Sequence, residues 1–179
     1  MKGLVLMVIL PLLLGAPEAL ANKLIEPGPR EKIAKGGFGA VPEREWNRLD
    51  EKEGKYQEIW TLDGDQLNKV TFYGGVPAGD PLFKERDKKN QPLPKVTENM
   101  LITDIPVLVE NTYRTLSPGT RFTLGTQTPA DFSGENGIRF AYTFIDDADE
   151  VERRGEAVGA FRNGKLYLIS YEAPAIYFY

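Results

Sequence analysis

The chain of 179 residues contains no cysteine and no histidine. Without these side chains a Ser-His-Asp or Cys-His catalytic site cannot be built, and zinc ligation by cysteine and histidine is excluded. The absence of cysteine also excludes a disulfide framework and the acylated cysteine of a bacterial lipoprotein, so stability must come from ordinary burial. These absences fit a bacterial envelope protein better than a small secreted eukaryotic domain.

Serine is scarce as well, with three copies at Ser117, Ser133 and Ser170. None lies in a Gly-x-Ser-x-Gly or Ser-x-x-Lys pattern, which argues against a serine nucleophile. The net charge is only −4, and charges of both signs are mixed along the chain. Because a nucleic-acid-binding surface needs a concentrated basic face, we expect no DNA or RNA partner. No stretch carries a cofactor signature, so we expect no cofactor.

The first 21 residues have the organisation of an export signal. Lys2 precedes an apolar run from Leu4 to Leu14, and Ala19-Leu20-Ala21 matches the small-x-small site of signal peptidase. The run holds about half of the residues that a membrane-spanning helix needs, and Pro11 interrupts it. We therefore predict a cleaved signal peptide over 1–21 and a soluble mature chain that is periplasmic or secreted.

Residues 22–42 are rich in proline and glycine and show no sustained apolar period. Such a composition cannot bury enough surface to become ordered by itself, which predicts a mobile N-terminal arm. The remaining residues, 43–179, have the length of a single domain with a substantial core. We predict one α+β domain over this range.

Alternating apolar residues indicate strands over the ranges 56–62, 67–73, 120–128 and 138–144. The first two strands are antiparallel neighbours, because only a short turn at Asp63-Gly64 separates them. The best helix candidate begins at Thr103, whose hydroxyl can cap the first turn, and ends before Ser117-Pro118-Gly119. An amphipathic helix of this kind covers one face of a sheet.

The strongest local pattern is a hairpin in which 156–162 and 165–171 flank Asn163-Gly164, the dipeptide that type I′ turns favour. If Arg162 pairs with Lys165, apolar residues fall on both sides of this ribbon. The ribbon should therefore lie inside a sheet that is covered on both faces. The helix from Thr103 can cover one face, and the other needs a second helix, a second layer of sheet, or a ligand or partner.

Five stretches carry a resemblance to a known family: 60–64, 67–72, 74–75, 140–144 and the closing hairpin 155–171. Their order resembles the small α+β domains of the PsbP/Mog1-like superfamily, many of whose bacterial members are exported. The resemblance implies a twisted antiparallel sheet covered by one or two helices, and a role in binding or assembly. The chain departs from the family pattern because it lacks the helix that normally follows the last strand.

The leading functional hypothesis is a non-enzymatic exported envelope protein that binds a protein partner or a small ligand on the sheet face opposite the helix. We expect Tyr142, Tyr167 and Tyr171 to make the contact, because tyrosine suits a surface that is half apolar and half wet.

The alternative is a carboxylate-dependent hydrolase acting on envelope glycans, with Asp146, Asp147 or Glu150 in the acid and base roles. This acidic cluster lacks the glycine and glutamate positions of a Ca²⁺ loop, so we expect no metal there. A third hypothesis is a purely structural component of the envelope.

Overall fold

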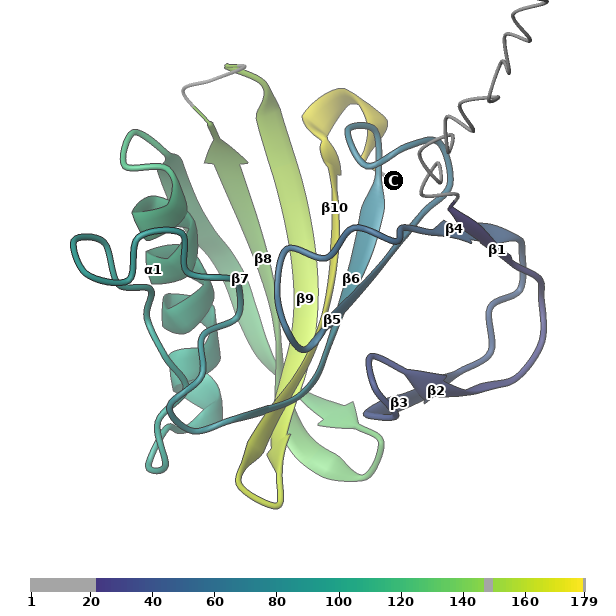
Figure 1. Cartoon of the computed structure of the whole chain (residues 1–179), viewed down its shortest axis with the longest axis horizontal. Helices are drawn as coiled ribbons and strands as arrows, with labels where there is room; N and C mark the ends of the chain where they lie inside the picture. Colours follow the sequence, from purple (N-terminus) through teal and green to yellow (C-terminus); the bar gives the residue numbers. More distant parts are fainter. Residues whose placement is uncertain (1–21, 147–149, 179) are drawn as a thin grey trace, which may run out of the picture.

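The computed structural model describes residues 22–146 and 150–178, and its main feature is an eight-stranded antiparallel sheet with a different cover on each face (Figure 1). The strand order is β1-β4-β5-β6-β10-β9-β8-β7. The strands are β1 (Lys23–Ile25), β4 (Trp46–Arg48), β5 (Gln57–Thr61), β6 (Lys69–Pro77), β7 (Arg121–Phe132), β8 (Glu135–Ile145), β9 (Glu152–Arg162) and β10 (Lys165–Pro174). The predicted signal peptide, 1–21, lies outside the described residues.

The closing hairpin has the predicted register. Arg162 pairs with Lys165, and Val158 pairs with Ile169. Asn163 and Gly164 have φ values of 51° and 69°, the left-handed conformations that a type I′ turn requires. Strand β9 also pairs with β8, and β10 pairs with β6, so the ribbon lies in the interior of the sheet. The predicted α+β class with an antiparallel sheet is therefore confirmed.

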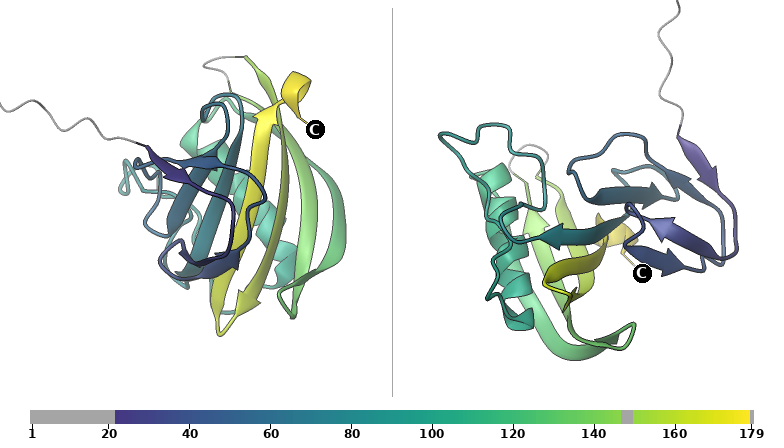
Figure 2. Two further views of the ribbon diagram at one scale, coloured as in Figure 1. Left: turned by 90° about the vertical axis from the view of Figure 1, so that its right-hand side faces the viewer. Right: turned by 60° about the horizontal axis from the view of Figure 1, so that its bottom comes forward.

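The helix α1 (Ile105–Leu116) covers one face of the sheet (Figure 2). Ile105, Leu108 and Val109 are buried against sheet residues such as Phe140 and Leu168. The loop between β6 and α1 adds further buried side chains to this helix-side core, namely Leu82, Phe83, Leu93 and Val96. These loop side chains pack in the same core as the buried residues of α1.

The helix start differs from the prediction. Thr103 lies in a short 3₁₀ turn, Ile102–Asp104, and α1 begins two residues later at Ile105. Asp104 occupies the N-cap position, but its carboxylate accepts the backbone N–H of Leu101 at 2.8 Å and caps no helical amide. Pro106 lies in the first turn, where its missing N–H costs nothing.

Over β5, β6 and β10, the other face of the sheet is covered by residues that we expected to form a mobile arm. Strand β1 joins the sheet beside β4, and a separate hairpin of β2 (Arg30–Ile33) and β3 (Phe38–Ala40) packs across the sheet. Ile33 and Phe38 are buried with Trp60 and Phe72 in a hairpin-side core. The boundary predicted at residue 43 therefore divides a packed unit, because a few well-placed apolar side chains suffice where a sheet already offers an apolar face.

Two glycines allow the β2-β3 hairpin to lie directly on the sheet. A Cβ atom at Gly37 would come within 2.7 Å of the Gly74 Cα, and one at Gly74 would come within 2.2 Å of the Ala34 carbonyl oxygen. The hairpin is also held by a buried carboxylate, because Glu58 accepts the Ala34 N–H at 3.0 Å and the indole N–H of Trp60 at 2.9 Å. No helix of the described ranges combines the length and apolarity that a bilayer crossing demands.

Candidate functional site

A cleft of about 810 Å³ opens at the end of the sheet where β8 and β10 finish, beside the last turn of α1. Its volume lies within the usual range for small-molecule sites, roughly 300–1,000 Å³. Strands, helix and loops all contribute to the wall, which combines charged side chains of both signs with aromatic ones. The lining includes Glu53, Lys69, Phe83, Tyr113, Phe144, Arg153 and Glu172.

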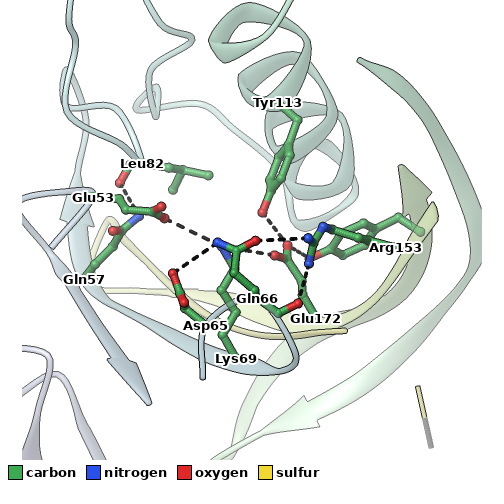
Figure 3. A network of polar contacts seen from close by, with 10 residues as sticks. Glu53, Gln57, Asp65, Gln66, Lys69, Leu82, Tyr113, Arg153 and Glu172 are labelled. Carbon is green, nitrogen blue, oxygen red and sulfur yellow. Dashed lines mark hydrogen bonds and ion pairs between the residues drawn. The ribbon is translucent and has the colours of Figure 1, made fainter. Parts of the chain in front are cut away.

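Glu172 forms the floor of the cleft, because it lines the cleft and only 3% of it is exposed. Figure 3 shows its carboxylate facing the Tyr113 hydroxyl and the Lys69 ammonium. Glu172 occupies the same phase of β10 as Leu166 and Leu168, so the strand alternation directs it toward the helix. One carboxylate oxygen, Oε1, accepts the hydroxyl of Tyr113 from α1 and the hydroxyl of Tyr142 from β8, the latter at 2.6 Å. Helix and sheet are thereby joined at one acidic group.

The bond between Tyr142 and Glu172 depends on Gly155. Gly155 lies on β9, between β8 and β10, and it pairs with both Tyr142 and Glu172. A Cβ atom at this position would lie 2.1 Å from the ring carbon that carries the Tyr142 hydroxyl. The glycine therefore leaves the space through which a tyrosine reaches a carboxylate two strands away.

The second oxygen of Glu172, Oε2, is buried and has no hydrogen-bond donor among the described residues. Lys69 faces it from β6 at 3.5 Å, and the same ammonium lies 3.8 Å from Glu53 at the rim. Burial alone would lower the pKa of Lys69, but the charges of Glu172 and Glu53 outweigh it, so the pKa lies above its usual value. Lys69 is thus held as a cation between two carboxylates.

Burial raises the pKa of the Tyr113 and Tyr142 phenols well above the usual value, and the charge of Glu172 raises it further. Both groups therefore remain hydrogen-bond donors at neutral pH.

At the mouth of the cleft, Arg153 donates to the backbone oxygen of Gln66 at 3.0 Å and to its side-chain oxygen at 3.2 Å. This contact ties β9 to the turn before β6 (Figure 3), and both residues line the cleft.

The three tyrosines expected to share a contact surface lie on both faces of the sheet. Tyr142 is 2% exposed and belongs to the helix-side core, where it stacks on Phe122. Tyr167 lies on the opposite face beneath the β2-β3 hairpin, with its ring edge-on to Phe38. Tyr171 is half-buried on that same face and contacts Phe178. The structure therefore brings no two of these side chains together at one open surface.

The acidic cluster of the hydrolase hypothesis is only partly described, since Asp147 and Asp149 lie outside the described residues. Asp146 lines the cleft rim, where its carboxylate accepts the hydroxyl of Ser117 at 3.0 Å. Glu150 is exposed and donates its backbone N–H to the Asp146 carbonyl. Within 22–146 and 150–178, no group of three or more acidic side chains is arranged to hold a metal ion.

Sequence reasoning missed Glu172 and Lys69, although one signal was available. Leu166, Leu168 and Ser170 mark the buried phase of the last strand, and Glu172 continues that phase. An acidic residue in a buried phase is rarely left unpaired, and Lys69 stands at the start of the strand that follows Asp63-Gly64. Their pairing across β6 and β10 could not be found without the strand order.

No family model matches the chain, and no curated protein matches it. Among solved structures, it is similar to the solution structure of cyanobacterial PsbP (CyanoP) from Synechocystis sp. PCC 6803. The identity is 15% and the TM-score 0.44, over 91% of this chain and 88% of the other. This neighbour is a PsbP protein, and PsbP is one of the two names of the superfamily that the sequence resembles. At this level of similarity, the fold description rests on the strand order of the chain itself, and no site residue is transferred.

Proposed function

We propose that this chain is a non-enzymatic binding protein of the bacterial envelope, exported by the signal over 1–21, and that it takes a small ligand in the cleft above Glu172. The observation that carries the proposal is a buried carboxylate oxygen without a hydrogen-bond donor at the floor of a cleft of ligand size. Lys69 offsets its charge from 3.5 Å, but burying an acceptor without a close hydrogen bond is costly, and a ligand that donates to it would offset this cost.

A binding role agrees with the way in which the floor is constructed. Glu172 is held by Tyr113 and Tyr142 on one oxygen and faces Lys69 with the other, so the group is fixed in place by three elements. Such fixation provides preorganised recognition, which reduces the entropy lost on binding. On the opposite sheet face, the β2-β3 hairpin already lies over Tyr167, so this part of the face is closed to a ligand.

Amide chemical shifts provide the test. The isotope-labelled chain is titrated with separate pools of amino acids, saccharides, short carboxylic acids, polyamines and inorganic phosphate. The proposal expects at least one pool to shift the amides around Lys69, Arg153 and Glu172. A shift confined to the opposite face, or no shift with any pool, would overturn it.

A matched pair of helix variants sharpens this test. Leu116 lines the cleft and is 36% exposed, whereas Val107 lies on the same helix outside the cleft and is 48% exposed. Leu116→Trp should fill the cleft and abolish the shifts, and Val107→Trp should leave them unchanged. If both folded variants kept, or both lost, the ligand-induced amide shifts, the ligand would not bind in this cleft.

A further inference from the structure

Oε2 of Glu172, which lacks a close hydrogen bond, and the ammonium of Lys69 require opposite hydrogen-bonding groups from a ligand. An ionised carboxylate only accepts hydrogen bonds, and an ammonium only donates them. Their 3.5 Å separation is longer than the roughly 2.7–2.9 Å of a good charge-assisted hydrogen bond. A hydroxyl group can satisfy both at once, because it donates to Glu172 while its oxygen accepts from Lys69. A ligand ammonium would repel Lys69, and a ligand carboxylate would repel Glu172.

The rest of the cleft also has nearly equal numbers of acidic and basic side chains. Six acidic and five basic side chains line it, so neither sign dominates. Glu53 stands beside Lys69 at the rim, and Arg153 lies at the mouth beside Gln66. A neutral ligand whose groups both donate and accept fits such interleaved charges without leaving one of them uncompensated.

Apolar surface between the charges adds a second requirement. Phe83, Tyr113 and Phe144 line the cleft near the helix, and Leu49 and Ile59 contribute on the β5 side. A saccharide ring offers apolar C–H faces between its hydroxyl groups, whereas a purely polar solute would leave this wall uncovered.

Resting on the proposed function, we infer that the ligand is a neutral, hydroxyl-rich molecule of the saccharide class. Calorimetry with four disaccharides on one β-1,4-linked skeleton tests the inference: cellobiose and N,N′-diacetylchitobiose are neutral, chitobiose carries ammonium groups, and cellobiouronic acid carries a carboxylate. We expect a neutral member to bind at least tenfold more tightly than its charged counterpart.

Two variants test the assigned contacts. Glu172→Gln and Lys69→Met should each weaken binding of the neutral disaccharide at least tenfold. Arg139→Gln, on the opposite face of the sheet, should leave it unchanged. Because Glu172 is buried, each variant is first checked for cooperative unfolding. Should Glu172→Gln fail to fold, Lys69→Met decides, since Lys69 is partly exposed, with 22% of its side chain open to solvent.

The saccharide inference and the binding function are contradicted by different results. Tighter binding of chitobiose or cellobiouronic acid, or no binding of any of the four, would overturn the saccharide inference. The binding function itself would still stand if another pool shifted the amides of the cleft. Unchanged affinity in both Glu172→Gln and Lys69→Met would overturn the assigned contacts.

Discussion

Among the residues that the structure describes, each side of the sheet buries one glutamate, and the two are held differently. On the hairpin side, both oxygens of Glu58 accept hydrogen bonds from neutral donors, the Ala34 N–H and the Trp60 indole. On the helix side, one oxygen of Glu172 is doubly bonded by phenols while the other faces only Lys69. The hydrogen-bonding capacity of the Glu58 carboxylate is satisfied within the fold, and this group attaches the hairpin. One oxygen of the Glu172 carboxylate lacks a close hydrogen bond at the floor of a cleft, where a ligand can supply one.

The largest expected effect tests whether the hairpin belongs to the core. Phe38→Ala removes a buried ring that contacts Phe72, Phe132 and Tyr167, so the free energy of unfolding should fall by about 3–5 kcal/mol. Urea denaturation measures the change. The matched control Val41→Ala alters a side chain that is 68% exposed and should cost no more than about 0.5 kcal/mol. Equal effects of the two variants would mean that the segment is the arm that its composition suggested.

A smaller loss is expected when the hairpin carboxylate is neutralised. Glu58→Gln places an NH₂ donor against the donors of Ala34 or Trp60, which should reduce the free energy of unfolding by about 1–3 kcal/mol. Chemical denaturation of this variant gives the value. A stability equal to that of the unaltered chain would show that the carboxylate does not hold the hairpin.

A loss of similar size is expected on the helix side from Gly155→Ala. The new methyl group would meet the Tyr142 ring, and overpacking of this kind costs about 1–3 kcal/mol. Gly125→Ala is the control, because the nearest atom to its Cβ would be 3.3 Å away. Thermal unfolding compares the two variants. If Gly155→Ala were the milder of the two, Tyr142 would not lie across β9 as described.

Alkaline pH should lower the stability of the chain through titratable groups on the helix side of the sheet. The folded state raises the pKa of Tyr73, Tyr113, Tyr142 and Lys69, so it binds these protons more tightly than the unfolded chain does. This contribution is complete below the ordinary tyrosine pKa of 10.0 and is lost as the pH rises through the raised values. The melting temperature should therefore fall above about pH 10, and less steeply in Tyr142→Phe. An identical slope in both proteins would contradict the assignment.

The smallest effect concerns an ion pair on the open surface of the sheet. Arg139 and Glu156 approach to 2.9 Å, but their side chains are 56% and 45% exposed. Solvent screening limits such pairs to about 0–1 kcal/mol, so Arg139→Ala should barely change the denaturation midpoint. A loss comparable to that of Glu58→Gln would show that this surface is covered in solution.

Regular periodicity explains what could be predicted from the sequence. The alternation from Ile138 to Phe144 and the Asn163-Gly164 turn indicate β8 and the closing hairpin, because each is encoded by neighbouring residues. The β2-β3 hairpin carries only a few buried residues around a tight turn, so no period can form. The contact of Glu172 with Tyr113 and Tyr142 joins residues 59 and 30 positions apart. Such a site depends on the order of the strands in the sheet, and the alternation of residues within one strand does not reveal that order.

The contrast between the two buried glutamates is tested most directly by calorimetric titration of a neutral β-1,4-linked disaccharide into folded Glu172→Gln and Glu58→Gln. The account predicts that Glu58→Gln binds as the unaltered chain does, and that Glu172→Gln binds at least tenfold more weakly. Equal affinity of the two variants, or no binding to the unaltered chain, would contradict it.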